Sequence, residues 1–527
     1  MPVPGAGMSA MLTAQRLVER SLRSYGERPA LLEGDRRLTY RELEVRTARL
    51  ANALLALGAG PDRPVATLMP NASEFVEVDL ACTRAGITRV GITDRLSPDE
   101  CRYIVADSEA SVLVAAPRLL ERLDGDLPAT LEHVLLVGGS SSNGSTGDYE
   151  LVLGSGSAVL DVPPVAPDAP NYILYTSGTT GRPKGATHSH GARAFAALNM
   201  AACELRLDGR SAMVHAGPVT HGSGSKILSF VAAGARNIVL PRFDPELVAG
   251  AVVDAGGTHT FLVPTMIQRL LDSGASVVAA ITLLEQISFG GAPIAAGLFR
   301  RAIETFGPTL TEVYGSCEAP HPITLLRPSD YLADDCSDRV LTSAGRAAQG
   351  VDIRLAGDDG EEVAPGELGE LLVRAPHLML GYWRDDEATL EAFTPDGWYS
   401  PGDLATIDED ALVTFRDRKR DLIISGGLNI YPSEVERVIA EHPGVSEVAV
   451  VGAPDEEWGE AVVAYVVPSD GALTADELIG WTRERLAPYK KPKRIEFLEQ
   501  LPLGSSNKVL KKELRERLWA GHERRVN

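Results

Sequence analysis

The segment Tyr175–Gly185, which reads Tyr-Thr-Ser-Gly-Thr-Thr-Gly-Arg-Pro-Lys-Gly, constrains most strongly what this chain can fold into. The residues before it, 171–175, have the aromatic and branched side chains of a short β-strand. The residues after it, 188–205, are rich in Ala and Leu and predict a helix. Its glycines let backbone N–H groups converge on an anion, and its hydroxyl groups and Lys184 suit phosphate oxygens. The segment therefore predicts a phosphate-binding loop between a strand and a helix.

This loop is not a Walker A motif, because Arg182 and Pro183 precede Lys184 where that motif requires a glycine before its lysine. A polar surface loop is the simpler interpretation of a segment rich in Gly, Ser and Thr. The eleven residues nevertheless resemble the signature of the adenylate-forming (AMP-binding) superfamily, which includes acyl-CoA synthetases, peptide-synthetase adenylation domains and firefly-type luciferases. The resemblance implies that ATP is bound by Thr176, Ser177, Gly178, Thr179, Thr180, Gly181 and Lys184.

The bulk composition narrows the class of protein. A chain of 527 residues is expected to have more than one domain, and 44% apolar residues can fill sizeable cores. The formal net charge of −21 argues against general binding to nucleic acid or to a membrane surface. The 5 cysteines form no close pair, and we see neither a signal peptide nor an apolar run long enough to span a bilayer. We therefore expect a cytoplasmic protein without a membrane span or a nucleic-acid partner.

Strand and helix signals alternate along most of the chain, which predicts an α/β fold in layers. The series between residues 64 and 115 also resembles the N-terminal subdomain of the superfamily, and a second series runs from 210 to 325. Shorter spacing and turns between 340 and 415 predict a β-rich subdomain. We expect a large N-terminal AMP-binding domain (1–417), a hinge (418–421), a small mobile α+β C-terminal domain (422–527) and a flexible surface loop at 138–157.

The segment Tyr314-Gly-Ser-Cys-Glu318 resembles the Tyr-Gly-x-Thr-Glu motif of the superfamily. The resemblance implies that Glu318 binds Mg²⁺, since a hard cation that bridges phosphates needs oxygen ligands. It also implies that Tyr314 stacks on adenine. Cys317 departs from the motif, because a thiol is a weaker hydrogen-bond donor than the Thr hydroxyl that usually contacts the α-phosphate. The hydroxyl of Ser316 is the neighbouring group that could replace it.

Two further segments resemble the parts of the superfamily that line the acyl group. One is 217–224, where the resemblance places His221 between the acyl group and the thiol channel, in substrate gating and packing; a lone His is otherwise more often structural. The other is 288–294, which resembles the Gly-Gly-Ala/Glu-Pro segment. The implied ATP contacts are Gly291, Ala292, Pro293, Tyr314, Gly315, Ser316 and Cys317, and the implied substrate contacts are His221, Gly222, Ser223, Gly290 and Gly315.

Two segments near residue 400 resemble ribose-binding elements of the superfamily. The segment 398–403 keeps the aspartate of the Gly-Trp-x-x-Thr-Gly-Asp pattern, although Pro401 replaces its Thr. A carboxylate such as Asp403 suits a bidentate contact with two ribose hydroxyls. The segment 415–436 is the second strongest match, and it places Arg418 at the ribose and Arg420 at the hinge.

The resemblance continues to the C-terminus. Ser425, Gly426 and Gly427 match a turn that faces the acyl-adenylate after domain rotation, and with Trp458 they are the expected CoA contacts. The segment 501–508 resembles the loop of the catalytic lysine. A cation between carboxylate and α-phosphate stabilises the charge that develops on both, and Lys508 takes that position. The expected catalytic residues are Lys508, His221 and Gly427.

These resemblances imply an ATP-dependent carboxylic acid–CoA ligase that uses ATP, Mg²⁺ and CoA. The acid and ATP give acyl-AMP and pyrophosphate, and a thiol then displaces AMP after the small domain turns about Arg420. The expected partners are a small carboxylic acid and the thiol of CoA or of a carrier protein, and a homodimer is left open. The sequence does not identify which carboxylic acid is activated. Lys226 either faces solvent, which we favour, or pairs with a second anionic group of the substrate.

Three alternatives stay open at this point. A stand-alone adenylation enzyme would load a carrier protein. A diazotase-like enzyme would activate nitrite or another small oxyanion in natural-product biosynthesis, which Cys317, Pro401 and the small run Gly222-Ser223-Gly224 leave open. A luciferase-like oxygenase is the third. A catalytically inert nucleotide-binding protein is disfavoured, because Lys508, Glu318 and Asp403 are all present.

Overall fold

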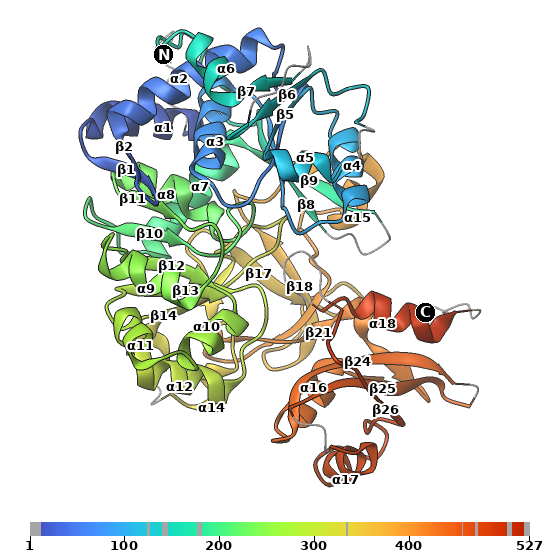
Figure 1. Cartoon of the computed structure of the whole chain (residues 1–527). Helices are drawn as coiled ribbons and strands as arrows, with labels where there is room; N and C mark the ends of the chain where they lie inside the picture. Colours follow the sequence, from blue (N-terminus) through green and yellow to red (C-terminus); the bar gives the residue numbers. More distant parts are fainter. Residues whose placement is uncertain are drawn as a thin grey trace, which may run out of the picture. The chain divides into compact units, whose positions relative to one another are not determined.

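The computed structural model describes residues 12–123, 127–139, 146–176, 182–333, 336–455, 457–469, 473–502 and 509–520 (Figure 1). By their internal contacts the residues form two compact units. The first is Met1–Ile353 with Val373–Tyr399, and the second is Arg354–Leu372 with Ser400–Asn527. Both units combine helices with sheets, which confirms the expected α/β class. The hinge at 418–421 stays a prediction. Among the described helices, none has both the length and the apolar character that crossing a membrane requires.

Local signals place the first elements of the chain. Helix α1 (Ala14–Tyr25) begins at Thr13, whose side chain accepts a hydrogen bond from the Arg16 N–H. Helix α2 (Tyr40–Ala56) begins with a capping box, in which Thr39 accepts from the Glu42 N–H and the Glu42 carboxylate accepts from the Thr39 N–H. The antiparallel strands β1 (Pro29–Glu33) and β2 (Arg36–Thr39) lie between the two helices.

An eight-stranded sheet in the first unit has the strand order β19-β9-β8-β4-β3-β5-β6-β7. Its β8-β4-β3-β5-β6-β7 portion is parallel, so the carboxyl ends of these strands share one edge. The strands are β3 (Val65–Leu68), β4 (Arg89–Ile92), β5 (Val112–Ala115), β6 (His133–Leu136), β7 (Thr146–Asp148), β8 (Pro170–Thr176), β9 (Lys184–Ser189) and β19 (Gly381–Tyr382), and the helices are α3 (Ser73–Ala85), α4 (Pro98–Asp107), α5 (Pro117–Glu121), α6 (Tyr149–Ser155) and α15 (Asp386–Ala392).

Two local expectations are wrong in this sheet. The phosphate loop does not lead directly into a helix, because β9 follows it and pairs antiparallel with both β8 and β19. Helix α7 (His190–Asn199) begins only after β9, with Ser189 as its cap, and continues as the π-helix η1 (Met200–Glu204). The flexible loop expected at 138–157 instead contains β7 and α6, with Tyr149 and Leu153 buried.

A nine-stranded sheet in the first unit has the order β16-β15-β14-β13-β12-β10-β11-β1-β2. The run from β14 to β1 is parallel, and the outer strands β2, β15 and β16 are antiparallel to their neighbours. The further elements are β10 (Ala212–His215), β11 (Arg236–Val239), β12 (His259–Leu262), β13 (Gln286–Gly290), β14 (Leu310–Tyr314), β15 (Thr324–Leu326), β16 (Arg346–Ala347), η2 (Gly224–Lys226), α8 (Ile227–Ala233), α9 (Pro245–Val253), α10 (Pro264–Leu271), α11 (Ala275–Ile281), α12 (Ala296–Phe306), α13 (Pro328–Ala333) and α14 (Asp338–Leu341).

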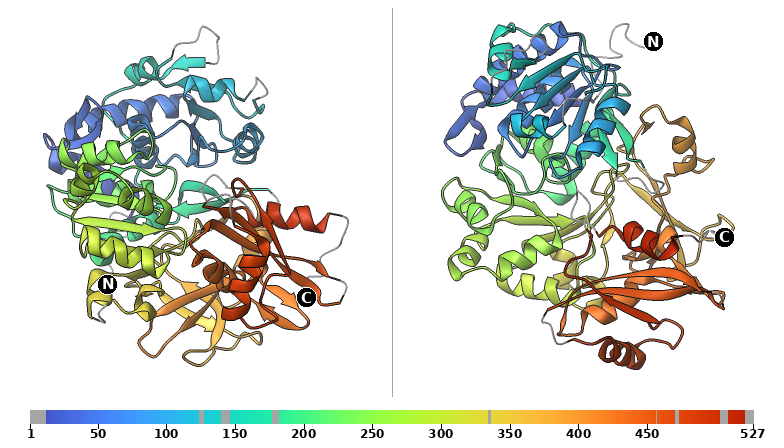
Figure 2. Two further views of the ribbon diagram at one scale, coloured as in Figure 1. Left: turned by 60° about the horizontal axis from the view of Figure 1, so that its bottom comes forward. Right: turned by 45° about the vertical axis from the view of Figure 1, so that its right-hand side comes forward.

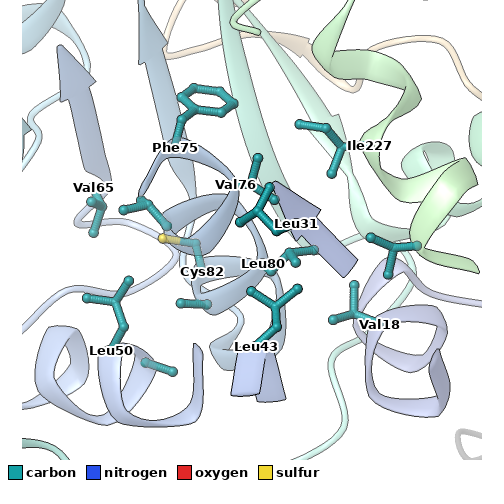
Figure 3. Packing of buried hydrophobic residues seen from close by; sticks show 14 of the residues in the cluster. Val18, Leu31, Leu43, Leu50, Val65, Phe75, Val76, Leu80, Cys82 and Ile227 are labelled. Atoms are coloured by element: carbon teal, nitrogen blue, oxygen red, sulfur yellow. The ribbon is translucent and has the colours of Figure 1, made fainter. Parts of the chain in front are cut away.

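One large apolar core joins the two sheets of the first unit. Side chains of α1, α2 and α3 meet side chains of β1, β3 and α8, as the close view in Figure 3 shows. Leu31, Phe75 and Ile227 are each at most 1% exposed although they come from three distant parts of the chain. Because interiors of proteins are close-packed, this core holds the two sheets in one arrangement.

The second unit contains a four-stranded sheet, with the order β17-β18-β20-β21, and a five-stranded sheet around β24 and β25. Helices α16 and α17 cover one face of the five-stranded sheet and α18 covers the other (Figures 1 and 2). The elements are β17 (Asp352–Ala356), β18 (Leu368–Arg374), β20 (Asp403–Ile407), β21 (Val413–Arg418), η3 (Lys419–Asp421), β22 (Ile423–Ser425), β23 (Leu428–Ile430), α16 (Pro432–Ala440), β24 (Val445–Asp455), β25 (Gly459–Pro468), α17 (Ala475–Arg485), β26 (Arg494–Phe497) and α18 (Lys511–Trp519).

A buried carboxyl group in β14 makes the stability of the fold depend on pH. Burial raises the pKa of Glu312 from its ordinary value of 4.5 to about 8. Between these two values the folded chain holds a proton that the unfolded chain has lost, so stability falls as the pH rises through this range.

We expect Glu312→Gln to remove this pH dependence, because glutamine imitates the protonated carboxyl and does not ionise. At about pH 8.5 the variant should be more stable than the wild type by up to about 5 kcal/mol, and at about pH 4.5 the two should be similar. Urea unfolding at both pH values measures the difference. An equal difference at the two pH values would contradict the assignment.

Candidate active site

Three loops that carry predicted site residues leave the same edge of the nine-stranded sheet. Strands β10, β13 and β14 belong to its parallel part, and the segments 217–224, 290–293 and 314–318 follow their carboxyl ends. In open α/β sheets this edge is where ligands bind. Close backbone packing there requires glycine, since a Cβ on Gly290 would lie 2.2 Å from the Val313 carbonyl oxygen. The structure therefore brings together the predicted adenine and substrate segments.

Glu318 is oriented by strand β19 of the other sheet. The Tyr382 hydroxyl donates a hydrogen bond of 3.0 Å to Glu318 Oε1, and the Met379 N–H donates one of 2.8 Å to the Glu318 carbonyl oxygen. The ammonium of Lys184 lies 5.3 Å from the centre of the Tyr382 ring, which is a cation–π distance. Burial and the Glu318 carboxylate raise the pKa of Tyr382 well above its ordinary value, so the phenol stays protonated. Tyr382 thus links the predicted phosphate-binding lysine to the predicted metal ligand.

The backbone around Cys317 is held from two sides. His188 on β9 donates from Nε2 to the Cys317 carbonyl oxygen at 2.7 Å, and its ring stacks on Tyr172 at 4.7 Å. The Ser316 hydroxyl accepts a 3.1 Å hydrogen bond from the Ala319 N–H. This hydroxyl therefore has a structural role in the turn and keeps its own proton for a further hydrogen bond. Cys317 and Glu318 are both half-buried.

His221 lies within the turn that follows β10. Its Nδ1 lies 2.8 Å from the Thr220 hydroxyl. The next residue packs closely, because a Cβ on Gly222 would lie 2.6 Å from the Phe261 ring. Ser223 is 1% exposed and its hydroxyl lies 3.0 Å from His215 Nδ1. The side chain of Ser223 thus supports the turn from inside, and a contact with substrate would come from its backbone.

The expectation that Lys226 faces solvent is wrong. Its side chain is 0% exposed and contacts the Glu204 carboxylate, whose side chain is also 0% exposed. Glu204 Oε1 accepts a further hydrogen bond of 2.6 Å from the Ser288 hydroxyl. A buried lysine is tolerated because it is paired in this way. Sequence spacing gave no signal, since Glu204 ends a π-helix in a different part of the chain.

The two predicted ribose residues lie side by side in the second unit. Asp403 begins β20, and Arg418 ends β21 directly opposite it in the antiparallel register. The Arg418 Nε and the Asp403 Oδ1 are 3.1 Å apart. Asp403 is 8% exposed, and Arg418 holds its carboxylate in place.

The predicted hinge residue, Arg420, follows in η3. Burial lowers the pKa of Arg420, and its Nε lies 4.0 Å from Asp421 Oδ2.

The predicted CoA residues also form one cluster. Gly426 and Gly427 make the turn between β22 and β23 with φ angles of +58° and +79°, which favour glycine. The Gly426 N–H donates to the Trp458 carbonyl oxygen at 2.7 Å, and a Cβ on Gly426 would lie 2.5 Å from the Trp458 ring. Ser425 pairs with the residue after Trp458 in the sheet. Trp458 is 45% exposed, so it is a surface residue rather than a core residue.

Several predicted residues lie outside the described residues: Ser177, Gly178, Thr179, Thr180, Gly181 and Lys508. Thr176 and Lys184 flank the phosphate loop as the last residue of β8 and the first of β9, and Gly291, Ala292 and Pro293 are exposed after β13.

In the described part of the chain no group of three or more His, Cys, Asp and Glu side chains could hold a metal ion. A single carboxylate such as Glu318 fits Mg²⁺, because Mg²⁺ takes its other ligands from water and substrate phosphates.

Sequence reasoning missed three residues of this site: Tyr382, His188 and Glu204. Tyr382 belongs to a strand of only two residues, which is too short to show alternation. The composition of 188–205 predicts a helix that includes His188, but His188 lies in β9. The available signal for Tyr382 was the turn residue Gly381 before two aromatic residues, which is typical of a short edge strand.

Comparison with known proteins gives extensive matches. A family model described as AMP-binding enzyme matches residues 18–383, and one described as AMP-binding enzyme C-terminal domain matches residues 434–508. A feruloyl-CoA synthase of Amycolatopsis sp. is 39% identical over 93% of this chain and 95% of its own length. The fatty acid–[acyl-carrier-protein] ligase ScoC of Streptomyces coeruleorubidus is 31% identical over 95% of each chain. The crystal structure of ATP-bound MatB from Rhodopseudomonas palustris has a TM-score of 0.86 at 30% identity, covering 96% of this chain and 99% of that chain.

We expect Tyr382→Phe to weaken Mg²⁺-dependent ATP binding roughly tenfold, because the ring under Lys184 stays while the hydrogen bond to the Glu318 carboxylate is lost. ATP titration by calorimetry, with Mg²⁺ and with EDTA, measures the effect, which should be absent in EDTA. Tyr382→Leu is the matched variant that also removes the ring. If Tyr382→Phe binds like the wild type and only Tyr382→Leu is impaired, the hydroxyl has no role in positioning Glu318.

Proposed function

Because the chain belongs to the AMP-binding enzyme family, we infer that it is an ATP-dependent carboxylic acid–CoA ligase of the AMP-forming type. The observation that carries this inference is the 39% identity to a feruloyl-CoA synthase over 93% of the chain. The positions of Glu318, Asp403 and Arg418 support it, because a carboxylate for Mg²⁺ and a paired carboxylate for ribose are what ATP binding needs.

The reaction has two steps. In the first, a carboxylate oxygen of the acid attacks the α-phosphorus of ATP, and the bond to pyrophosphate breaks to give acyl-AMP. In the second, the thiolate sulfur of CoA attacks the acyl carbon, and the bond to AMP breaks to give the thioester. When bound, Mg²⁺ neutralises charge on the phosphates during the first step.

We assign the residues of this chain to these steps from their positions. Thr176 and Lys184 flank the loop that would bind the phosphates, and Tyr382 keeps the Glu318 carboxylate pointed where it can take a metal ion. Asp403, oriented by Arg418, would accept hydrogen bonds from the ribose. Each of these groups is held by a partner within its own unit, which reduces the reorganisation that the reaction requires.

The C-terminal region supplies the groups that differ between the two steps. We propose that residues 1–417 form the AMP-binding domain and that residues 422–527 rotate about 418–421, with Arg420 as the hinge residue. Lys508 would serve the first step, and the turn at Gly426 and Gly427 would serve the second. The short 3-10 turn η3, which separates β21 from β22, supports a hinge there.

CoA is the favoured thiol, and a carrier protein is the second candidate because ScoC, a relative of this chain, acts on an acyl carrier protein. CoA and ATP are intracellular metabolites, and their use supports a cytoplasmic location. Pyrophosphate release across a panel of carboxylic acids and nitrite, with CoA, with a carrier protein or with neither, tests the function. Acid-dependent release followed by thioester formation with CoA is the expected result. Release with nitrite alone would contradict it.

We expect Lys508→Ala to abolish acyl-AMP formation and to spare thioester formation from supplied acyl-AMP. Loss of one contact to transition-state charge typically costs ~10²–10³ in rate. Rapid-quench measurement of both half-reactions provides the comparison. Lys512→Ala is the matched control, since Lys512 is a half-exposed lysine of α18 four residues further along. Equal losses in both half-reactions would defeat the assignment.

We expect Cys317→Thr to raise the rate of adenylation or to lower the KM for ATP by roughly tenfold. A hydroxyl gives a charge-assisted hydrogen bond to phosphate worth ~1.5–3 kcal/mol, and a thiol gives a poorer one. Pyrophosphate release is measured for Cys317→Thr, for Ser316→Ala and for the double variant. If Cys317→Thr is slower while Ser316→Ala is severely impaired, the phosphate contact belongs to Ser316.

A further inference from the structure

An aromatic stack borders the residues assigned to the substrate. We call the set His221–Ser223, Gly290 and Gly315 the acyl site. The rings of Phe261 and His321 lie 5.3 Å apart with an interplanar angle of 10°. Phe261 lies against Gly222, as shown above, and a Cβ on Gly315 would lie 2.5 Å from the His321 backbone nitrogen. The Phe261 ring of this stack therefore lies against Gly222 and the His321 backbone lies against Gly315, and we call the stacked pair the wall of the acyl site.

This wall carries no charge at neutral pH. Burial and the nearby Lys226 ammonium lower the pKa of His321 to about 3. The Ser225 hydroxyl lies 3.2 Å from His321 Nε2, so the ring also has a neutral hydrogen-bond partner. Among the described residues, the charges that act on His321 come from Lys226, Glu204 and His377, and burial lowers the pKa of His377 to about 4. Burial lowers the pKa of Lys226 and the contact with the Glu204 carboxylate opposes this, so the Lys226–Glu204 pair is the charged group behind the wall.

Lys226 is paired with one buried carboxylate, that of Glu204. Its Nζ lies 5.6 Å from the centre of the Phe261 ring and contacts the Glu204 carboxylate. The Glu204 carbonyl oxygen accepts a hydrogen bond of 2.7 Å from the Gln286 side chain, which fixes this residue against β13. Burial opposes ionisation of Glu204, but the Lys226 ammonium and the hydrogen bonds outweigh it and lower its pKa. Glu204 is therefore an anion at neutral pH.

The Lys226–Glu204 pair lies close beneath the acyl site. Ser288, which donates to Glu204 Oε1, stands two residues before Gly290 on β13, and both face the same side of the sheet. Two residues of a strand span about 6.6 Å. Lys226 also ends the 3-10 helix η2 (Gly224–Lys226), which directly follows Ser223 of the acyl site. A substrate bound at the acyl site with its far end directed toward Ser288 would bring that end to this buried pair.

We propose that Glu204 is a specificity-determining residue, which cancels the charge of Lys226 so that the enzyme accepts monocarboxylic acids with an uncharged far end and rejects dicarboxylic acids. This inference rests on the proposed function. A second carboxylate on the substrate would have to leave water and would meet a cation that Glu204 already neutralises. An uncharged tail pays no such penalty and can pack against the Phe261 and His321 rings.

Packing alone is a weak explanation for the pair. A buried ion pair contributes little net stability compared with apolar residues of the same volume. Moreover, Glu204 Oε2 is buried and accepts no hydrogen bond from the residues that the structure describes. A buried carboxylate oxygen without a hydrogen bond lowers the stability of the folded state, because its desolvation is not compensated. These features favour a role for Glu204 beyond stabilising the fold.

The first test uses the wild-type enzyme and matched acids, hexanoate against adipate and 3-phenylpropanoate against its para-carboxy derivative. Acid-dependent pyrophosphate release gives kcat/KM for each. We expect values at least a hundredfold lower for both dicarboxylic acids. Similar values within each pair would overturn the proposal. If no acid supports release by the folded enzyme, the proposed function itself fails, and the inference falls with it.

The second test uses Glu204→Gln, which leaves Lys226 without its carboxylate. The second carboxylate of a substrate can then pair with Lys226. We therefore expect kcat/KM for the dicarboxylic acids to rise, so that the ratio of kcat/KM between each monocarboxylic acid and its dicarboxylic partner falls at least tenfold. The double variant Glu204→Gln with Lys226→Met removes both charges and should restore the preference. An unchanged preference in Glu204→Gln would overturn the proposal.

A matched control separates specificity from loss of a buried charge. Asp79 on α3 is also buried, 1% exposed, and it is paired with Arg89 at 2.7 Å and with Arg193. Asp79→Asn should lower the melting temperature and leave the ratio between acids unchanged. A ratio that shifts equally in Asp79→Asn would overturn the proposal. If Glu204→Gln does not fold, the wild-type comparison of matched acids decides alone.

Discussion

The hydrogen bond from the Tyr382 hydroxyl to the Glu318 carboxylate is the contact on which the geometry of the site depends. Glu318 follows a strand of the nine-stranded sheet, whereas Tyr382 belongs to the eight-stranded sheet and lies beside Lys184. The bond therefore fixes the distance between a carboxylate suited to a metal ion and a lysine suited to phosphate. The His188 bond to the Cys317 carbonyl oxygen joins the same two sheets one residue away. Two such bonds keep the loop in place before any ligand binds, which is the preorganisation that electrostatic catalysis requires.

Burial of titratable groups follows one pattern around this site. Lys226 is paired with Glu204 and Asp79 with two arginines, so these buried charges are balanced. The buried histidines near the site are neutral instead, since burial lowers the pKa of His188 to about 4 and of His321 to about 3. A neutral interior leaves Lys184 and Glu318, which are only half-buried, as charges available to ligands. The selective exposure of a few charges is what lets a protein of net charge −21 bind anions locally.

Much of the fold could be predicted from the sequence because its signals are local. Helices α2 and α4 begin at capping boxes formed by Thr39 with Glu42 and by Ser97 with Glu100, which are signals within four residues, and the alternation of strands with helices predicts the α/β class. Contacts between distant residues could not be predicted. Strand β9 replaces the expected start of a helix because β8 and β19 pair with it on both sides. Lys226 is buried because it forms an ion pair with Glu204, which belongs to another element. No sequence pattern in either segment predicts that ion pair.

The residues that we propose for acid selection and for phosphate binding lie on different elements of the first unit. Glu204 and Ser288 lie below the end of β13, whereas Glu318 and Lys184 lie at strand ends of two sheets. Tyr382 and His188 hold the loop at Glu318 and Cys317, whereas Glu204 contacts Lys226, Ser288 and Gln286. Separate support of this kind lets the range of acids vary while the adenylation step stays the same, because function resides in sites on a fold rather than in the fold itself. The charge of Glu204 would then affect which acids bind at the acyl site without affecting the residues that bind phosphate.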